Sequence, residues 1–259
     1  MNNLIEGMST DERYHKNVLY ITPEQQDRIK QTRIVFGGVG LASVLAESAM
    51  RMGFERFVFI DGDDVEMSNL NRQNYEQADI GNPKVTSLVR RLEAINPNVE
   101  VTAHNLFLNP DNIEGYVDGC DIAVNAIDFD VEDTPFAFDQ VCRKKGIPII
   151  HPLNLGWAGA AFVVTPESEQ VFDISRNEGR FELSLIESIL NYLENRNDLD
   201  LKWFYEFYEN YKKHSEKISP PQLSVGSFIT AGLVTNILFS LVNSLEVKTY
   251  PDLYFLSSR

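Results

Sequence analysis

Short apolar runs alternate with helical segments along the first 150 residues of the chain. Residues 33–36 and 57–60 read RIVF and FVFI, a pattern typical of strands buried on both faces of a parallel sheet. Between them, residues 41–52 carry apolar side chains on a 3.6-residue period, and Gly53 ends this predicted helix. The order of strand, glycine loop, helix and strand predicts the first βαβ unit of a doubly wound fold.

The same alternation continues to residue 150. It predicts two further helices and three further strands: helices at 84–95 and 136–145, and strands at 99–103, 121–126 and 147–150. Helices of this length between strands imply a parallel sheet that is covered on both faces. We therefore predict an α/β protein built on a doubly wound, mostly parallel Rossmann-like sheet with an inserted helical segment.

The inserted segment follows residue 165, where the pattern changes. Residues 166–222 are rich in charged and aromatic side chains and predict two helices, near 182–195 and 201–213. The aromatic run at 203–208 favours a packed core, and a surface that grips a partner protein is the alternative. The predicted division has three parts: a nucleotide-binding core with a helical lead-in (1–165), an acidic, aromatic helical insertion (166–222), and a helix and strand that return to the core (223–259).

The chain is acidic. Its 259 residues include 38 acidic and 23 basic side chains, which give a formal charge of −15 at pH 7. A surface of this charge repels phosphate backbones, so we expect no nucleic acid as the main ligand. A mononucleotide stays compatible with it, because a mononucleotide needs only a local pocket of positive groups.

Residues 218–245 contain no charged side chain, so a membrane helix has to be considered. Two prolines and several Ser, Thr and Asn residues interrupt the segment, and a buried helix is the better interpretation. The first 16 residues contain no apolar stretch of the secretory type. We therefore expect a cytoplasmic protein with no membrane attachment.

Gly37, Gly38 and Gly40 follow the first strand, and Asp61 ends the second. Glycines let a backbone approach phosphate groups and leave helix N-terminal N–H groups open to an anion. An acid at the end of the second strand suits the ribose hydroxyls. These features fit ATP and NAD equally well, and a purely structural turn is the alternative for the glycines.

The residues after Asp61 decide between these nucleotides. Residues 61–73 read DGDDVEMSNLNRQ, and residues 79–84 read DIGNPK. These runs closely resemble the signature of the ThiF/MoeB/HesA family, the bacterial relatives of ubiquitin-activating enzymes, in the spacing of Asn69, Arg72, Gln73 and Lys84. The resemblance covers roughly residues 12–165 and 223–256, and includes a strand that ends in a metal-binding aspartate, here Asp128.

Members of this family bind ATP and Mg²⁺ and adenylate the C-terminal carboxylate of a small ubiquitin-fold protein or a peptide. The resemblance implies that Asp61 holds the ribose and that Asp128 binds Mg²⁺. It also implies that the phosphates are surrounded by Asn69, Arg72 and Lys84. The pocket would be supported by Asp63 and Gln73.

These residue types suit the reaction, because a carboxylate that attacks the α-phosphorus needs its own charge and that of the triphosphate offset. Arg72 and Lys84 supply positive charge, Asn69 supplies a neutral donor, and Asp128 supplies a hard oxygen ligand for Mg²⁺. We expect Arg72, Lys84 and Asp128 to act in catalysis. Taken singly, each basic residue is more often part of a surface salt bridge, and Asp128 is more often a helix cap or loop acid; it is their joint appearance that favours a site.

The roles of the neighbouring acidic residues stay open. Asp63 is a pocket residue or a turn residue. Asp130, Glu132 and Asp133 form a second metal contact or, more simply, a solvated loop.

The glycine loop departs from the family's usual G-x-G-G-x-G-S pattern. An alignment ending at Ser43 places Val39 and Ala42 where glycines are usual, and a β-branched residue restricts the loop backbone. A shift by one residue makes Gly38 and Gly40 the first pair instead. Both registers remain open.

Many relatives carry R-Y-x-R near the N-terminus, and its second arginine reaches the phosphates of the partner in a homodimer. Here residues 13–16 read RYHK. Lys16 keeps the charge but lacks the planar fork of arginine. The resemblance therefore implies a homodimer in which Lys16 or Arg13 acts in trans, and a plain surface helix is the alternative.

The chain contains two cysteines, Cys120 and Cys142, and both fall in predicted core elements. Relatives that pass on their product as a thioester use a cysteine in the linker after the core, and many hold zinc there with two C-x-x-C pairs. Residues 166–222 contain no cysteine. We therefore predict adenylation without a thioester on this chain, and no zinc site.

Residues 151–159 follow the last predicted parallel strand. The carboxyl ends of such strands line the crevice of an open α/β sheet, so we expect this loop to border the acceptor carboxylate. His151 is interpreted as a structural residue. A role as a base is the alternative, although a carboxylate nucleophile needs none.

The sequence as a whole favours a homodimeric, ATP- and Mg²⁺-dependent adenylyltransferase that acts on the C-terminus of a protein or peptide. The insertion would select that partner or cover the site. The main alternative is a non-catalytic scaffold of the same fold, in which Val39 and Lys16 reflect lost turnover. An NAD-dependent oxidoreductase is weaker, because it rests on the glycine loop alone, and the acidic surface disfavours a tRNA-modifying relative.

Overall fold

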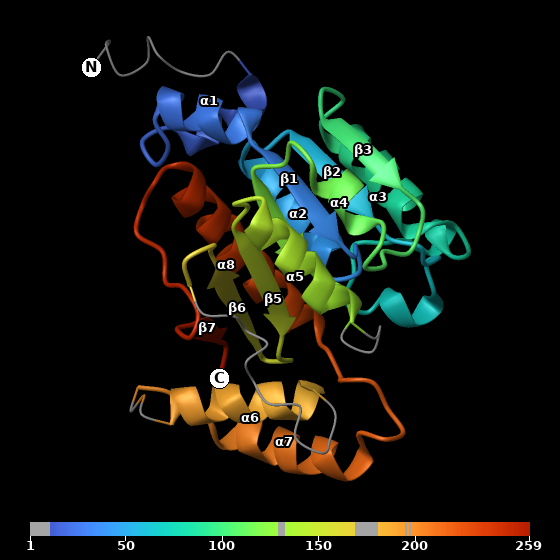
Figure 1. The fold of residues 1–259 in the computed structure, drawn as a ribbon, viewed down its shortest axis with the longest axis vertical. Coiled ribbons are helices and arrows are strands. Elements are labelled where there is room, and N and C mark those ends of the chain that lie inside the picture. Colours follow the sequence, from blue (N-terminus) through green and yellow to red (C-terminus); the bar gives the residue numbers. More distant parts are fainter. Residues whose placement is uncertain (1–10, 129–132, 169–180, 195, 197) are drawn as a thin grey trace.

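A seven-stranded sheet organises the part of the chain that the structure describes (Figure 1). The structure is a computed structural model, and it describes residues 11–128, 133–168, 181–194, 196 and 198–259. The strand order is β3-β2-β1-β4-β5-β6-β7. The strands are β1 (Arg33–Gly37), β2 (Arg56–Ile60), β3 (Glu100–His104), β4 (Ile122–Asn125), β5 (Ile149–Asn154), β6 (Ala158–Val164) and β7 (Tyr254–Ser257).

The strands β3, β2, β1, β4 and β5 run parallel, and β6 pairs antiparallel with both β5 and β7. The chain winds outward from β1 in one direction and from β4 in the other, so the switch point lies between these two strands. Ligands of doubly wound sheets bind beyond the carboxyl ends of the strands at such a point. The predicted doubly wound, mostly parallel Rossmann-like fold is confirmed.

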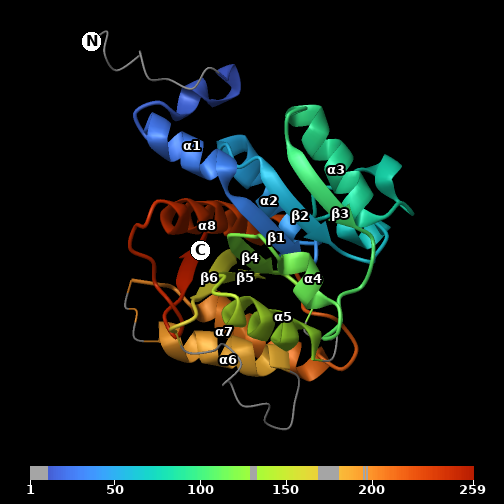
Figure 2. The same cartoon turned by 45° about the horizontal axis from the view of Figure 1, so that its top comes forward.

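Helices cover both faces of the sheet (Figure 2). Alternate strand residues point to opposite faces, so Ile34 and Phe36 join one apolar cluster and Val35 joins the other. The first cluster is covered by α2 (Ala42–Met52), α3 (Lys84–Ile95) and α8 (Ser224–Val242). The second is covered by α4 (Ile113–Val117), α5 (Thr134–Lys144), α6 (Phe181–Leu193) and α7 (Lys202–His214).

The two helices of the insertion belong to this second layer. Phe204, Tyr208 and Tyr211 of α7 are buried with the apolar side of α6, so these aromatic residues are core residues. Tyr205 is the more exposed member of the run, at 37%. The division of the chain into three parts stays a prediction.

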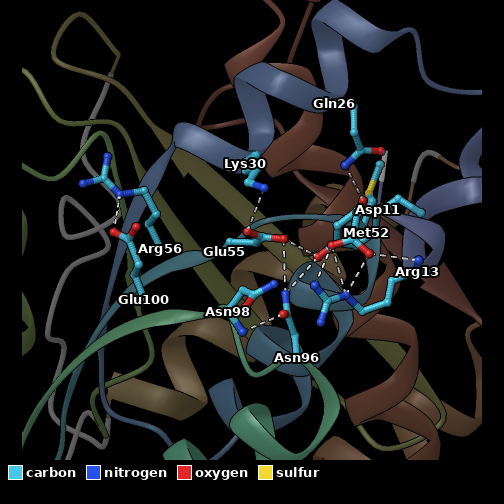
Figure 3. A network of polar contacts seen from close by, with 11 residues as sticks. Asp11, Arg13, Gln26, Lys30, Met52, Glu55, Arg56, Asn96, Asn98 and Glu100 are labelled. Atoms are coloured by element: carbon cyan, nitrogen blue, oxygen red, sulfur yellow. Dashed lines mark hydrogen bonds and ion pairs between the residues drawn. The ribbon is translucent and has the colours of Figure 1, made fainter. Parts of the chain in front are cut away.

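The N-terminal lead-in is attached at the amino end of β2 (Figure 3). It consists of a 3-10 helix, Glu12–Asn17, and of α1 (Pro23–Gln31), which begins at Thr22 with a capping box. Tyr14 Oη donates to Glu55 Oε1 at 2.8 Å, and Asn96 Nδ2 donates to the same oxygen at 3.2 Å. This buried group fixes the lead-in at the amino ends of the parallel strands, on the side of the sheet opposite their carboxyl ends.

Helix α8 is long and apolar enough to cross a membrane by length and composition, and it is the one helix of the described chain that meets this test. It packs against α2 and β6, and Val234, Ile237 and Leu238 are fully buried. A core helix meets the same test, and these contacts explain the apolar sequence of α8 without a membrane.

The structure corrects the expected loop at residues 151–159. β5 extends through His151 to Asn154, and β6 begins at Ala158, so the connection is short. The sequence AGAAFVV of β6 is buried at every position and therefore lacks the alternation that marks a half-exposed strand. Gly159 of β6 packs on α8 so closely that an added Cβ would lie 2.6 Å from the Thr230 backbone nitrogen.

Candidate functional site

The loop after β1 makes a sharp turn at Gly38. This residue has a φ of +79°, and an added Cβ would lie 2.5 Å from the carbonyl oxygen of Ala126. Its N–H donates to the carbonyl oxygen of Ile60 at 2.9 Å. Only glycine fits here, because the conformation and the close contact both exclude a side chain.

The two departures from the family's glycine pattern are buried residues. Val39 and Ala42 are both fully buried in the α2 side of the core. Val39 does not have the positive φ that glycine would be needed for. Its N–H donates to Asp61 Oδ2 at 2.7 Å, and its carbonyl accepts from Tyr75 Oη at 2.8 Å. The valine therefore stabilises the loop without backbone strain.

Asp61, directly after β2, is the anchor of this loop. Its Oδ2 accepts from Val39 and its Oδ1 accepts the backbone N–H of Asp63 at 2.8 Å. Burial raises the pKa of the Asp61 carboxyl, while the Val39 N–H and the positive charge of Lys84 act in the opposite direction. Both carboxylate oxygens of Asp61 therefore accept backbone N–H groups, and the residue keeps partial exposure.

Lys84, the first residue of α3, reaches the same place. Its Nζ lies 2.7 Å from Asp63 Oδ2, and its N–H donates to the Asp63 carbonyl at 2.9 Å. Lys84 is 7% exposed, whereas the Asp63 side chain is 48% exposed. Asp63 thus pairs with a pocket residue, and the structure brings Asp61, Asp63 and Lys84 together.

Asn69 shapes the segment that carries Arg72 and Gln73. It closes a 3-10 helix, Met67–Asn69, and its Oδ1 accepts the backbone N–H of Glu66 at 2.9 Å. Its carbonyl accepts the N–H groups of Arg72 and Gln73. A second short 3-10 helix, Gln77–Asp79, follows before α3.

Arg72 is held by a residue that the sequence interpretation did not include. Its Nε donates to Gln222 Oε1 at 2.7 Å, and its Nη1 donates to the carbonyl of Ser68 at 2.9 Å. Desolvation lowers the pKa of Arg72, and the charge of Asp128 opposes this effect. Arg72 and Asp128 therefore interact electrostatically, although Arg72 lies in the segment after β2 and Asp128 in the segment after β4. Gln222 joins this site to the segment that precedes α8.

Gln73 lies against the glycine loop and has an unused acceptor. An added Cβ at Gly40 would approach Gln73 Nε2 to 3.0 Å. Gln73 Oε1 is buried and has no hydrogen-bond partner among the described residues. A buried polar atom without a partner costs roughly 1–3 kcal/mol. A hydrogen-bond donor on a bound ligand, such as a nucleotide, would satisfy this oxygen.

Asp128 is exposed beyond the carboxyl end of β4. A buried network lies beneath its loop: Asn125 Nδ2 donates to Asp139 Oδ1 at 2.8 Å, and His151 Nε2 lies 2.8 Å from Asp139 Oδ2. His151 is 2% exposed, so it is a structural residue of β5. Asp130 and Glu132 lie outside the described residues, so their roles stay open.

Arg13 and Lys16 do not join the other predicted residues. Both belong to the lead-in at the amino end of β2, where Arg13 pairs with Asp11 at 2.5 Å (Figure 3). The chain from Glu55, which the lead-in contacts, through β2 to Asp61 spans roughly 20 Å at about 3.3 Å per residue. Within one chain these residues are therefore remote from Asp61.

The two cysteines are poor nucleophiles. Cys120 is 7% exposed and Cys142 is fully buried. Burial raises the pKa of Cys120 to about 11, and it raises the pKa of Cys142 as well. A thiol reacts as its thiolate, so neither group is activated at neutral pH.

Phe107 was also missed by the sequence interpretation. It follows β3 and is 64% exposed, and its ring would meet a Cβ added at Gly62 at 2.7 Å. An exposed aromatic ring beside the residue after Asp61 offers a surface on which a base can stack. In the sequence, the one indication for Phe107 was its position shortly after a predicted strand, because no motif includes this residue.

The described residues contain no group of three or more His, Cys, Asp or Glu side chains that could hold a metal ion by themselves. Mg²⁺ needs no such group, because it is commonly held by one or two carboxylates together with substrate phosphates. Asp128 beside Arg72 fits that kind of site. The crevice thus combines two basic side chains, a glycine turn and an exposed acid.

Comparisons with known proteins point to one family. A sequence model described as "ThiF family" matches residues 14–254. The SAMP-activating enzyme E1 of Haloferax volcanii is 31% identical over 160 residues, which cover 60% of this chain and 58% of that protein. A Bacillus subtilis tRNA threonylcarbamoyladenosine dehydratase is 32% identical over 166 residues, 63% of each chain. The sulfur carrier protein ThiS adenylyltransferase of Bacillus subtilis is 33% identical over 162 residues, 60% of this chain and 48% of that protein.

The matched regions therefore span about half to two thirds of these relatives. Solved structures resemble the whole chain. A crystal structure of E. coli MccB with MccA-N7isoASN has a TM-score of 0.73 at 18% identity, and covers 97% of this chain and 70% of that one. One of E. coli MccB with ATP has a TM-score of 0.69 at 16% identity, and covers 96% and 72%. At these identities the likeness concerns the fold.

Proposed function

The chain belongs to the ThiF family, and from this premise we propose that it is an ATP- and Mg²⁺-dependent adenylyltransferase. Its substrate is the C-terminal carboxylate of a small ubiquitin-like or sulfur-carrier protein, or of a peptide. Relatives named adenylyltransferase or activating enzyme support the reaction class. The observation that carries the proposal is the Lys84–Asp63 contact beside the glycine loop that Asp61 anchors, and the electrostatic interaction of Arg72 with Asp128 supports it.

The proposed reaction forms one bond and breaks one. An oxygen of the acceptor carboxylate bonds to the α-phosphorus of ATP, and the bond from that phosphorus to the bridging oxygen of pyrophosphate breaks. Pyrophosphate leaves with the electron pair, and an acyl adenylate remains. Arg72 and Lys84 offset the charge of the phosphates, and Asp61 binds the ribose. Mg²⁺, held by Asp128, would neutralise further phosphate charge.

We further propose that no thioester forms on this chain. Cys120 and Cys142 are its two cysteines, and both are buried with raised pKa values. The adenylate would therefore pass directly to an external nucleophile. A cytoplasmic location agrees with this scheme and stays a prediction.

A homodimer is part of the proposal, and α8 offers the surface for it. The helix contains no charged residue, and Phe228 on it is 63% exposed. An added Cβ at Gly232, one turn further, meets nothing within 4 Å. In a chain of charge −15, an uncharged face is where two copies approach with the least repulsion. Phe228→Glu should give monomers in light scattering.

In that dimer, Lys16 is the better candidate for a contribution in trans. It is exposed, and the described residues show no ion pair for it. Arg13, in contrast, is already paired with Asp11.

A second candidate function comes from the tRNA threonylcarbamoyladenosine dehydratases among the relatives. Such an activity would use the same nucleotide site on a carboxylate attached to tRNA. The charge of −15 weighs against it, because an acidic surface repels an RNA backbone.

ATP–pyrophosphate exchange with candidate acceptors tests the proposal. Candidates are small proteins encoded beside this chain, with a tail that ends in Gly-Gly, and threonylcarbamoyl-tRNA as the alternative acceptor. We expect exchange with a protein acceptor and its loss in Asp128→Ala. Absence of exchange with every acceptor, together with no ATP binding at millimolar concentration, would favour a non-catalytic scaffold.

A further inference from the structure

A recess of about 380 Å³ lies between the end of β5 and α7. We call it the tail recess, and its apolar wall consists of Leu155, Trp157, Trp203, Phe207, Pro221 and Leu223. Arg259 also lines it, with its guanidinium 4.2 Å from the centre of the Trp157 ring. The volume is at the lower end for ligand sites, so it suits a short segment of chain.

Residues 221–223 contribute both to the tail recess and to the contact of Arg72. Pro221 and Leu223 in its wall are the neighbours of Gln222, which accepts the hydrogen bond of Arg72 Nε at 2.7 Å. Consecutive Cα atoms are 3.8 Å apart. The wall therefore begins about one residue from the side chain that holds Arg72.

The recess is also fixed to the carboxyl end of β5. Asn154, the last residue of that strand, donates from Nδ2 to the carbonyl of Leu223 at 2.8 Å and to Ser227 Oγ at 2.9 Å. A wall attached to a strand end and to a core helix is preformed. Binding a side chain there needs little rearrangement.

We propose that the tail recess binds an aromatic or large aliphatic side chain of the acceptor's C-terminal tail, a few residues before the carboxylate that is adenylated. This inference rests on the proposed function, which brings that carboxylate to the phosphates whose charge Arg72 offsets. An extended tail advances about 3.3 Å per residue, so a residue upstream of the carboxylate reaches the recess from there.

The chemistry of the wall selects this occupant. The wall contains six apolar side chains, two of them tryptophans. Burying an apolar group against them contributes about 25 cal/mol of binding free energy per Å² of apolar surface removed from water. Trp203 Nε1 is buried and has no acceptor among the described residues. A backbone carbonyl of an entering tail is the kind of group that would satisfy such a donor.

Tryptophan fluorescence tests the proposal directly, because Trp157 and Trp203 are the two tryptophans of the chain and both line the recess. The probes are acetylated five-residue peptides that end in Gly-Gly, with Phe at one of the three preceding positions and Ser elsewhere. An all-Ser peptide is the reference. We expect one Phe position to shift the emission saturably with a Kd at least tenfold lower, which corresponds to about 1.4 kcal/mol.

Two variants on α7 should remove this preference. Asn210→Phe adds volume at an exposed residue that lines the recess, and Phe207→Ala removes part of the wall. Tyr205→Ala is the matched control, because Tyr205 lies on the same helix but not in the recess. Equal affinity for Phe and Ser peptides, or a Phe preference that survives both variants, would overturn the proposal.

Exchange kinetics with the same peptides separate this inference from the proposed function. If fluorescence shows a preference for Phe but no peptide is adenylated, the recess would stand as a binding site for an apolar side chain, and the proposed adenylyltransferase activity would be contradicted. Adenylation of Phe and Ser peptides at equal rates and affinities would support the enzyme and contradict the recess as a specificity site.

Discussion

Lys84 Nζ lies 2.7 Å from Asp63 Oδ2, and the backbone of the same two residues is joined by a hydrogen bond of 2.9 Å. These contacts fix the start of α3 to the segment that follows β2. A nearly buried ammonium group, 7% exposed as a residue, is thereby held at the edge of the crevice with a half-exposed acid as its partner.

Replacing Lys84 by Met should lower kcat/KM for adenylation by about 10²–10³, because it removes one preorganised charge from the phosphates. Asp63→Asn is the matched variant: it leaves Lys84 charged and removes a carboxylate that competes with the phosphates. We expect it to lower the Kd for ATP at low ionic strength. Calorimetric titration and exchange kinetics measure both effects, and wild-type rates in Lys84→Met would exclude a role at the phosphates.

Asp61 gives the folded protein a defined pH dependence. Burial raises its pKa above the ordinary 3.8, so the folded state keeps this proton at pH values where the unfolded chain has lost it. The contribution of Asp61 to the free energy of unfolding is therefore greatest below pH 3.8 and falls as the pH rises through the folded pKa.

Asp61→Asn removes this titration. The variant should gain stability relative to the wild type as the pH rises from 3.8 through the raised pKa of the folded state, with no further change above that pKa. Denaturant unfolding at several pH values measures the difference. A difference that does not vary with pH would contradict the assignment, and ATP binding should weaken at every pH.

The buried His151–Asp139 pair should matter for stability. His151→Ala leaves Oδ2 of the buried Asp139 without its His151 partner, and an unsatisfied buried polar atom typically costs about 1–3 kcal/mol. Tm falls by roughly 2–4 °C per kcal/mol in proteins of this size. His214→Ala is the control, because His214 is exposed and its ring contacts the backbone of Asn210. Equal Tm values for the two variants would contradict the pairing.

The cysteines should be dispensable for adenylation. The double variant Cys120→Ala, Cys142→Ala should keep the wild-type exchange rate, because both thiols are buried away from the crevice. Native protein should react slowly with iodoacetamide at pH 7 and rapidly once unfolded. A product adduct on the wild type that is released by thiols and absent in the double variant would show a thioester after all.

The βαβ unit from Arg33 to Asp61 was predictable because its periodicity and its glycine turn both arise from local sequence. β6 was not, since a strand buried at every position has no alternation, and its length allows strand or helix. The extension of β5 beyond residue 150 was also missed, because its pairing with β6, such as that of Pro152 with Ala161, depends on a strand that was not predicted.

Residues within one motif, such as Asn69 and Arg72, were assigned to the candidate site through the family resemblance, and their roles stay predictions. Gln222 was not assigned to it, because it lies 150 residues from Arg72 in sequence and meets it only through the packing of the chain. Phe107 was missed because exposure beside Gly62 is a property of the fold. The close contact of Gly38 with Ala126 was likewise not visible in the sequence, and both registers of the glycine loop against the family pattern stay predictions.

The most direct test of the whole account is calorimetric titration of the intact chain with ATP and Mg²⁺, with NAD as the competing ligand. The account predicts saturable ATP binding well below millimolar concentration, a loss of at least tenfold in Arg72→Ala and in Lys84→Met, and no binding of NAD. Binding of NAD in place of ATP, or ATP binding that neither variant weakens, would contradict it.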